Sequence, residues 1–386
     1  MDIEKHVLLQ LCRLIGGNSD FEPDLYANVK IDEEKLYQTC LYHQVLPFFY
    51  YFRDIFRKSF PSLSQDFFSK AKNYSIFNTT RLMVYENFLI EFDQQVSNAG
   101  IDYRLLKGIA LAFEIYEEPY LRTFGDLDIL ILPDSLEIVN ELLLQNGYFI
   151  CEDLYSAFPT EIIKKYSFAR HYIRKKPSIL AVDVHLNLSG KLHPFQFDLM
   201  EFWNNSRDVE INESKFRTFN KEYTTVYLLY HAFKHYYFKL IWIIDVYEIL
   251  SDDMDFDKLG KLIIKYNLVK MWNVFLNISR DLFGRIPGNA DILDEKKYHS
   301  LKRHRIINKD SMLRGVLPYS PSIGRIILPL IYLPSFLQKV RYLLRQLFPP
   351  KDAIRDFYVN KSIMPDWSDY LKLRTKAILE LIHHVK

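Results

Sequence analysis

The sequence predicts an α+β protein in which a mixed segment lies between two helical ones. The chain has 386 residues, of which 49% are hydrophobic, 25% charged and 16% aromatic, with only 12 glycines. These values are typical of globular proteins and exclude a chain that is mainly disordered. A periodicity of 3.6 residues dominates both ends of the chain, whereas short alternating runs gather between them.

The first hundred residues predict helices. Apolar residues recur at helical spacing from Val7 to Ile15, from Glu33 to Val45 and from about Leu63 to Val96. The third stretch stops at Asn98-Ala99-Gly100, where glycine permits the backbone that ends a helix. We therefore expect an N-terminal helical domain over residues 1–99.

The pattern changes after residue 100. Strand-like runs cover residues 101–106, 126–132, 168–174, 179–186 and 214–219, and a helix is predicted from Ser135 to Asn146. The helical pattern returns after Lys221 and is strongest from Tyr223 to Leu250. This order predicts a mixed domain over residues 100–220 and a C-terminal helical domain over residues 221–386.

The net charge and the cysteine content indicate which binding partners and which cellular compartment suit the protein. Fifty Lys and Arg against 48 Asp and Glu give a formal net charge of +2, so no overall field attracts nucleic acid or anionic lipid. Cys12, Cys40 and Cys151 are odd in number and lack the spacing of a zinc ribbon, which favours a reducing, cytoplasmic compartment.

No segment has the features of a signal peptide or a transmembrane helix. The N-terminus carries acidic residues before its apolar run and no small-residue cleavage site. The most apolar later stretch, residues 326–337, is too short for a bilayer and contains two prolines. Apolar and basic residues alternate just after it as on interfacial helices, but a packed helix is the favoured interpretation.

Carboxylates mark the chemistry of the mixed segment. Alternation along a strand places Asp126 and Asp128 on one face. Such a pair repels itself unless a cation lies between the carboxylates, and hard oxygen ligands suit Mg²⁺ or Mn²⁺. Two-metal sites usually take a third carboxylate from a neighbouring strand, and Asp183 is the candidate. His185 shares the face of Asp183, where it either orients a second substrate or acts as a base, or is a hydrogen-bonded structural neighbour.

Residues that suit phosphate lie just upstream. Lys107 and Gly108 end a strand-like run before a helical one, so Gly108 is expected at a turn where backbone can approach a phosphate. Lys107 adds a positive charge there. Arg122, four residues before Asp126, is expected to clamp a triphosphate or to screen the carboxylates.

The order of these residues resembles the polymerase-β-like nucleotidyltransferase superfamily, which includes DNA polymerase β, antibiotic nucleotidyltransferases and abortive-infection-type toxins. The segments Leu106–Leu111 and Arg122–Leu130 are similar to the block "LKG-x-A-L … R … D-[LI]-D-[LI]-L" of uncharacterised bacterial nucleotidyltransferases. Further matches are Asp183-Val184-His185, His231-x-x-Lys234-His235 with Trp242 and Asp245, and Leu347 to Pro350. One departure is Ile109, where the superfamily usually has serine or glycine.

The resemblance implies a short mixed sheet with helices, flanked by helical domains. It implies an enzyme that uses Mg²⁺ or Mn²⁺ to transfer a nucleoside monophosphate from an NTP to an acceptor hydroxyl, with release of pyrophosphate. Asp126, Asp128 and Asp183 would hold the metal ions, while Lys107, Gly108 and Arg122 would bind phosphates. The base, the acceptor and the oligomeric state have no readable signature in the sequence.

The helix from Tyr223 onward carries residues with two interpretations each. The spacing of His231 and His235 suits two zinc ligands, but no HExxH glutamate accompanies them, and an acceptor-side or structural role is favoured. The resemblance implies that Lys234 contacts the nucleotide, whereas its aromatic neighbours indicate a packed core. Asp245 is expected to be a buried partner of a nearby cation.

Two alternative functions stay open. Ile109 motivates a nucleotide-binding or interaction protein without catalysis. The basic segment 296–309 motivates a toxin-type nucleotidyltransferase that acts on tRNA, although such a run is more often a solvated helix face.

Overall fold

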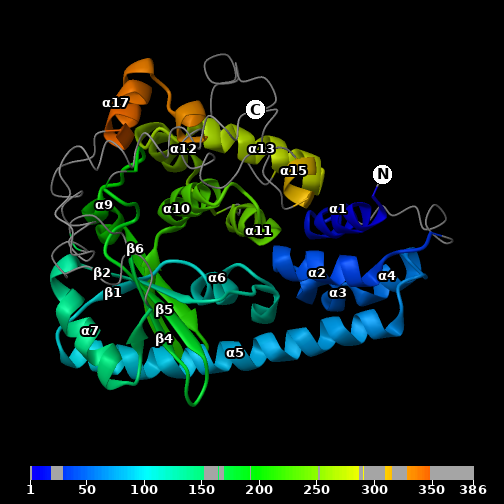
Figure 1. The fold of residues 1–386 in the computed structure, drawn as a ribbon, viewed down its shortest axis with the longest axis horizontal. Helices are drawn as coiled ribbons and strands as arrows, with labels where there is room; N and C mark the ends of the chain where they lie inside the picture. The colour runs from blue at the N-terminus through cyan, green and yellow to red at the C-terminus, as the bar shows by residue number, and fades with distance from the viewer. Residues whose placement is uncertain are drawn as a thin grey trace. The chain divides into compact units, whose positions relative to one another are not determined.

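The computed structural model describes residues 2–18, 29–151, 164, 169–191, 193–250, 253–286, 290, 309–314 and 328–347. Its fold is α+β, with one mixed sheet flanked by helices, as the sequence predicts (Figure 1). The chain forms two compact units. The first comprises Met1–Gln95, Arg104–Asp128 and Glu201–Pro318, and the second comprises Val96–Tyr103, Ile129–Met200 and Tyr319–Lys386. The domain boundaries expected from the sequence stay a prediction.

The sheet has seven strands in the order β3-β4-β5-β2-β1-β7-β6. Their bounds are β1 Tyr103–Leu105, β2 Leu127–Ile131, β3 Phe149–Ile150, β4 Ala169–Arg174, β5 Leu180–His185, β6 Ser206–Ile211 and β7 Ser214–Phe219. β4 pairs antiparallel with β5, and β6 with β7, whereas β1 runs parallel to β7. The five strand-like runs of the sequence thus all contain strands.

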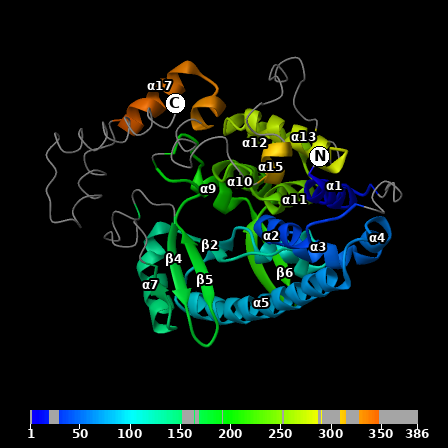
Figure 2. The ribbon, with the colours of Figure 1, turned by 45° about the vertical axis from the view of Figure 1, so that its right-hand side comes forward.

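The first unit begins with helices α1 Ile3–Ile15, α2 Glu33–His43, α3 Leu46–Tyr51, α4 Arg53–Ser59 and α5 Gln65–Asn98. The three helices predicted for this part of the chain are confirmed as α1, α2 and α5. The ammonium of Lys35 binds Asp2 and Glu4 at 3.0 and 2.9 Å and so ties α2 to α1. α5 passes alongside α2 and α3 (Figures 1 and 2), where Phe67 contacts the ring of Phe49.

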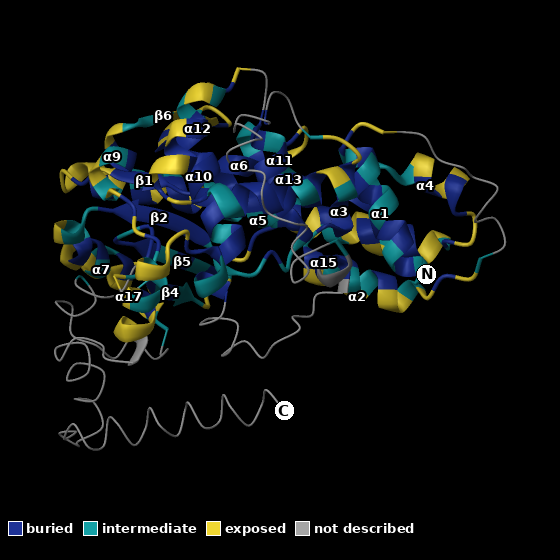
Figure 3. Ribbon diagram, turned by 90° about the horizontal axis from the view of Figure 1, so that it is seen from above, coloured by how far each residue is buried: buried dark blue, intermediate teal, exposed yellow. Residues whose placement is uncertain are grey.

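Further helices complete the first unit. They are α6 Ile109–Glu114, the 3₁₀ turn η2 Pro119–Leu121, α9 Leu199–Asn204, α10 Lys221–Lys234, α11 Leu240–Ile249, α12 Phe256–Lys265, α13 Val269–Phe283 and α15 Lys309–Arg314. α10 packs on α11, α12, α13 and β7, and Figure 3 shows α10 and α11 as largely buried. The buried side chains of these helices form the core of the unit.

The helical stretch predicted from Tyr223 to Leu250 is broken in the structure. Helix α10 ends at Lys234, and α11 begins at Leu240. Tyr236 and Tyr237 have φ angles of 63° and 56°, the left-handed conformation that ends helices. The ring of Tyr237 is fully buried, and its N–H donates to the carbonyl of Ala232 at 2.7 Å, so packing offsets the backbone strain.

The second unit holds the 3₁₀ turn η3 Pro133–Ser135, α7 Leu136–Gln145, the strands β3, β4 and β5, and α17 Phe336–Leu347. α7 confirms the helix predicted before Gly147, and it lies beside β4 in Figures 1 and 2. The hydroxyl of Tyr172 on β4 donates to Asn140 Oδ1 on α7 at 3.1 Å, which fixes the helix on the strand.

Two predicted features fall outside what the structure describes. Residues 296–308 of the basic segment and residues 348–350 of the C-terminal match lie beyond the described ranges. Among the helices that are described, none combines the length and the apolar character that a membrane span requires.

Candidate functional site

A tight turn joins β1 to α6. β1 ends at Leu105, α6 begins at Ile109, and Gly108 between them has φ 62° and ψ −111°, a conformation that glycine adopts far more easily than other residues. The N–H of Leu106 donates to the carbonyl of Asp128 at 3.2 Å, which ties the turn to β2. The side chain of Ile109 is fully buried, so this position serves packing. The turn places Lys107 beside the carboxylates of the strand.

Lys107 lies between the two carboxylates that the sequence singles out. Its ammonium is 2.5 Å from Asp128 Oδ2 and 4.0 Å from Asp126 Oδ1. The side chain of Asp128 is 2% exposed, whereas that of Asp126, just before β2, is 38% exposed. A carboxylate buried as deeply as Asp128 requires a nearby cation. Lys107 supplies one positive charge to it, and Asp126 faces solvent.

Helix α5 holds the loop that precedes β2. The side chains of Asn78 and Tyr85 donate hydrogen bonds to the carbonyls of Tyr120 and Gly125, at 2.6 and 3.0 Å. Arg81 donates to the carbonyl of Phe124. The N-terminal helices therefore position the backbone that leads directly into Asp126 and Asp128.

Arg122, in the same loop, forms a buried bidentate ion pair with Asp245 on α11. Its Nε and Nη2 lie 2.6 and 2.7 Å from the two carboxylate oxygens, and the side chains are 3% and 1% exposed. Burial disfavours the charged guanidinium, but Asp245 raises the pKa of Arg122 above its usual range. Tyr116 donates to Asp245 Oδ1 at 2.6 Å. The fork of Arg122 is thus occupied by the chain itself, and its contact with phosphate stays a prediction.

The histidines at the end of α10 form an aromatic cluster with Trp242 of α11. The ring centroids of His231 and His235 are 4.7 Å apart and lie 5.3 and 5.0 Å from Trp242. Burial and the positive charges of Lys107 and Lys234 lower the pKa of His231 well below its usual range and that of His235 to about 3. Both rings are therefore uncharged at neutral pH.

Two lysines flank this cluster. The ammonium of Lys239 lies 5.4 Å from the centre of the Trp242 ring, and Lys234 ends α10. Burial and the nearby charge of Arg122 lower the pKa of Lys239. The two histidines are neutral, and the positive charges that act on His231 come from Lys107, Lys234 and Arg122.

Asp183 and His185 lie on β5 in the second unit. Asp183 is directly opposite His171 of β4, and the Nδ1 of His171 is 2.6 Å from Asp183 Oδ1. His185 is 4% exposed.

Asp183 and His185 are potential metal ligands on one strand of the second unit. Each offers one ligand atom, and the two atoms lie within 4.8 Å of each other. A carboxylate and an imidazole can bind a divalent cation, and the carboxylate oxygens suit Mg²⁺ or Mn²⁺. The roles of Asp126 and Asp128 as further ligands stay predictions.

Comparison with known proteins identifies the family. Residues 29–284 match the model of a family described as uncharacterised nucleotidyltransferase. The chain belongs to this family of nucleotidyltransferases. The protein is therefore a transferase, and the match covers all the candidate site residues named above. None of the curated proteins matches the sequence.

Among solved structures, an antigenic nucleotidyltransferase-like protein from Paracoccidioides brasiliensis is similar to this nucleotidyltransferase at 16% identity, with a TM-score of 0.29 over 51% of this chain and 91% of that one.

Sequence reasoning missed three residues of the nucleotidyltransferase. Tyr116 and Lys239 carry no motif that distinguishes them from core or surface residues. His171 had a signal, because a hairpin centred on Pro177 pairs positions whose distances from that residue are equal, which places His171 opposite Asp183.

Proposed function

We propose that this nucleotidyltransferase moves a nucleoside monophosphate from an NTP donor to an acceptor hydroxyl and releases pyrophosphate. Family membership supports the class of reaction. The observation that carries the metal-dependent form of the proposal is the pair of potential ligands Asp183 and His185, whose ligand atoms lie within 4.8 Å of each other. The deeply buried carboxylate of Asp128 supports it as well, because a buried carboxylate is unfavourable without cations nearby.

In the proposed site, Asp126, Asp128 and Asp183 hold Mg²⁺ or Mn²⁺. The bound ions would stabilise the charge that develops on the transferred phosphoryl group and on the attacking and leaving oxygens. Asp126 is the more exposed of the first two carboxylates and can reach an incoming metal–nucleotide complex. His185 adds an imidazole beside Asp183, on the side of the acceptor.

In this proposal, basic side chains and the backbone at Gly108 bind the phosphates of the NTP. Lys107 neutralises Asp128 at 2.5 Å and is close enough to exchange this partner for a phosphate oxygen once a metal ion carries the compensating charge. Gly108 lets the backbone approach a phosphate. Lys234 supplies a further charge from the end of α10. We assign to Arg122 the holding of the loop before β2, because Asp245 occupies its guanidinium.

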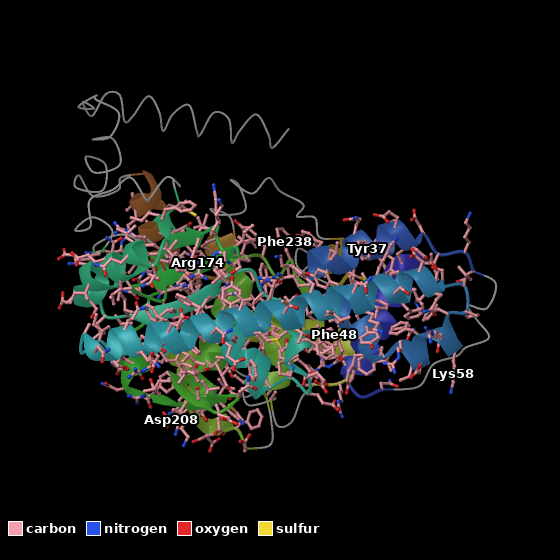
Figure 4. The ribbon with its side chains drawn as sticks, turned by 90° about the horizontal axis from the view of Figure 1, so that it is seen from below. Tyr37, Phe48, Lys58, Arg174, Asp208 and Phe238 are labelled. Carbon is pink, nitrogen blue, oxygen red and sulfur yellow. The ribbon has the colours of Figure 1, made fainter. Side chains whose placement is uncertain are left out.

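The first experiment measures thermal stability with each of the four NTPs, with and without Mg²⁺ or Mn²⁺. An NTP at about a hundred times its dissociation constant stabilises the folded state by roughly 2.7 kcal/mol, which is a shift of a few degrees. We expect this shift in the wild type and in Asp208→Asn, which removes an exposed carboxylate from β6 (Figure 4). Asp126→Asn and Asp128→Asn should lose it.

Pyrophosphate release then separates catalysis from binding. A metal-dependent shift accompanied by pyrophosphate release, absent in Asp128→Asn, is the expected result. A shift without release from any acceptor mixture would favour a nucleotide-binding protein that lacks turnover. If no NTP shifts the wild type with either metal, or if Asp128→Asn transfers as fast as the wild type, the proposal is wrong.

We also propose a reducing, cytoplasmic location. Cys12 and Cys40 are fully buried thiols that form no disulfide, which supports this compartment.

A further inference from the structure

A histidine faces the proposed metal ligand Asp183 across two strands of the second unit. In the antiparallel pair of β4 and β5, His171 is the direct partner of Asp183. The Nδ1 of His171 lies 2.6 Å from Asp183 Oδ1, and the two side chains are 38% and 16% exposed. The carboxylate of Asp183 is therefore partly shielded from water, which strengthens the hydrogen bond, but it is not closed off from an approaching ion.

The pair lies on the functional face of β5. Val182 and Val184 are fully buried, and alternation places Asp183 and His185 on the opposite face of the strand. His171 shares that face with them, because directly opposed residues of a ladder project to the same side of a sheet. The histidine thus contacts the proposed ligand Asp183 from the neighbouring strand.

The hydrogen bond from His171 can orient the carboxylate of Asp183. The torsion that turns an aspartate carboxylate is broad, so no rotamer well fixes the direction of its oxygens. A donor on Oδ1 fixes that direction and lets Oδ2 bind a cation. In metal sites, a group that orients a ligand in this way changes metal affinity typically 10- to 100-fold.

We propose that His171 is a positioning residue for the metal site. Its Nδ1–H donates to Oδ1 of Asp183 and holds the carboxylate in the orientation that binds the ion. This inference rests on the proposed function, in which Asp183 is a metal ligand. The competing interpretation is a cross-strand pair that stabilises the sheet and leaves metal affinity unchanged.

The test compares two replacements of the imidazole in the full chain. His171→Asn keeps an N–H donor at the position of Nδ1, whereas His171→Leu removes the donor and keeps an apolar side chain of similar reach. Mn²⁺ alone is the probe, and its dissociation constant is measured by isothermal titration calorimetry. We expect His171→Leu to bind Mn²⁺ about 10- to 100-fold more weakly than the wild type, and His171→Asn to stay within about threefold of it.

Each outcome decides the inference. Wild-type affinity in His171→Leu overturns it, and so does an equal loss in both variants, because the ring and not its donor would then matter. If His171→Leu does not fold in a metal-free melting experiment, His171→Gln takes its place. The amide of glutamine lies one carbon further out than Nδ1 of the histidine, so this variant should also bind Mn²⁺ more weakly.

A fourth protein separates this inference from the proposed function. If the wild type binds no Mn²⁺, or if Asp183→Asn binds it as tightly as the wild type, Asp183 is not a ligand and the metal site itself is refuted. If Asp183→Asn loses affinity while His171→Leu keeps it, the metal site stands and only the role of His171 is refuted.

Discussion

Breaking the buried pair between Arg122 and Asp245 should destabilise the protein strongly. The two side chains are 3% and 1% exposed, and the N–O distances are 2.6 and 2.7 Å. Water cannot solvate the charge that remains when one partner is removed, which costs about 3–5 kcal/mol. Loss of the hydrogen bond from Tyr116 adds about 1 kcal/mol. We expect Asp245→Ala to lower the free energy of unfolding in urea by about 4–6 kcal/mol.

A matched double variant tests the reason for this loss. Replacing both partners, in Arg122→Met with Asp245→Leu, leaves neither charge of the pair unpaired and should recover most of the stability. Recovered stability together with wild-type NTP affinity supports the role of Arg122 in holding the loop. Recovered stability with lost NTP affinity would instead restore the phosphate contact expected from the sequence. A change below about 1 kcal/mol in Asp245→Ala would refute the reasoning, because an exposed pair behaves in that way.

Three further predictions concern protonation and backbone strain. Burial lowers the pKa of His43 to about 4, so between pH 6.5 and 4 the unfolded chain binds a proton at this residue that the folded chain does not. The free energy of unfolding should therefore fall by about 3 kcal/mol over this range, and His43→Gln should show a shallower pH dependence in urea unfolding. Burial raises the pKa of Glu248 to about 7, so the free energy of unfolding should fall as the pH rises from 4.5 to 7. Glu248→Gln should be about 2 kcal/mol more stable than the wild type at pH 8, and equal stability of the two proteins would contradict this. Gly108→Ala, strained at φ 62°, should lose about 1–2 kcal/mol in thermal unfolding, while Gly125→Ala serves as its comparison.

Periodicity predicted most of the fold, because long helices and half-buried strands repeat one pattern many times. β6 escaped detection since its solvent-facing residues, including Asp208 and Glu210, are charged, and it lies at the edge of the sheet. Its two core residues, Val209 and Ile211, are too few to give a strong alternating signal. The break after α10 had no signal either, because tyrosine at positive φ is held by tertiary packing.

The local half of the site was predictable and the distant half was not. Lys107 follows β1, and the carboxylates of Asp126 and Asp128 lie at the start of the neighbouring strand β2, so the pairing of two strands close in sequence brings them together. The partner of Arg122 lies 123 residues further along the chain, and only packing of α11 selects it. Asp245 was expected to meet a cation, but its sequence neighbours do not say which one.

The hydrogen bonds from α5 to the loop before β2 bear on how this enzyme can be divided. Three side chains of α5 bind the carbonyls of Tyr120, Phe124 and Gly125, which every residue type supplies. The loop can therefore change its side chains in evolution and still be held, while α5 cannot be dispensed with. A fragment of residues 100–220 would contain Asp126 and Asp128 but would lose both α5 and Asp245. The smallest active form should instead reach from α5 through α11, which lies within the part of the chain matched by the family.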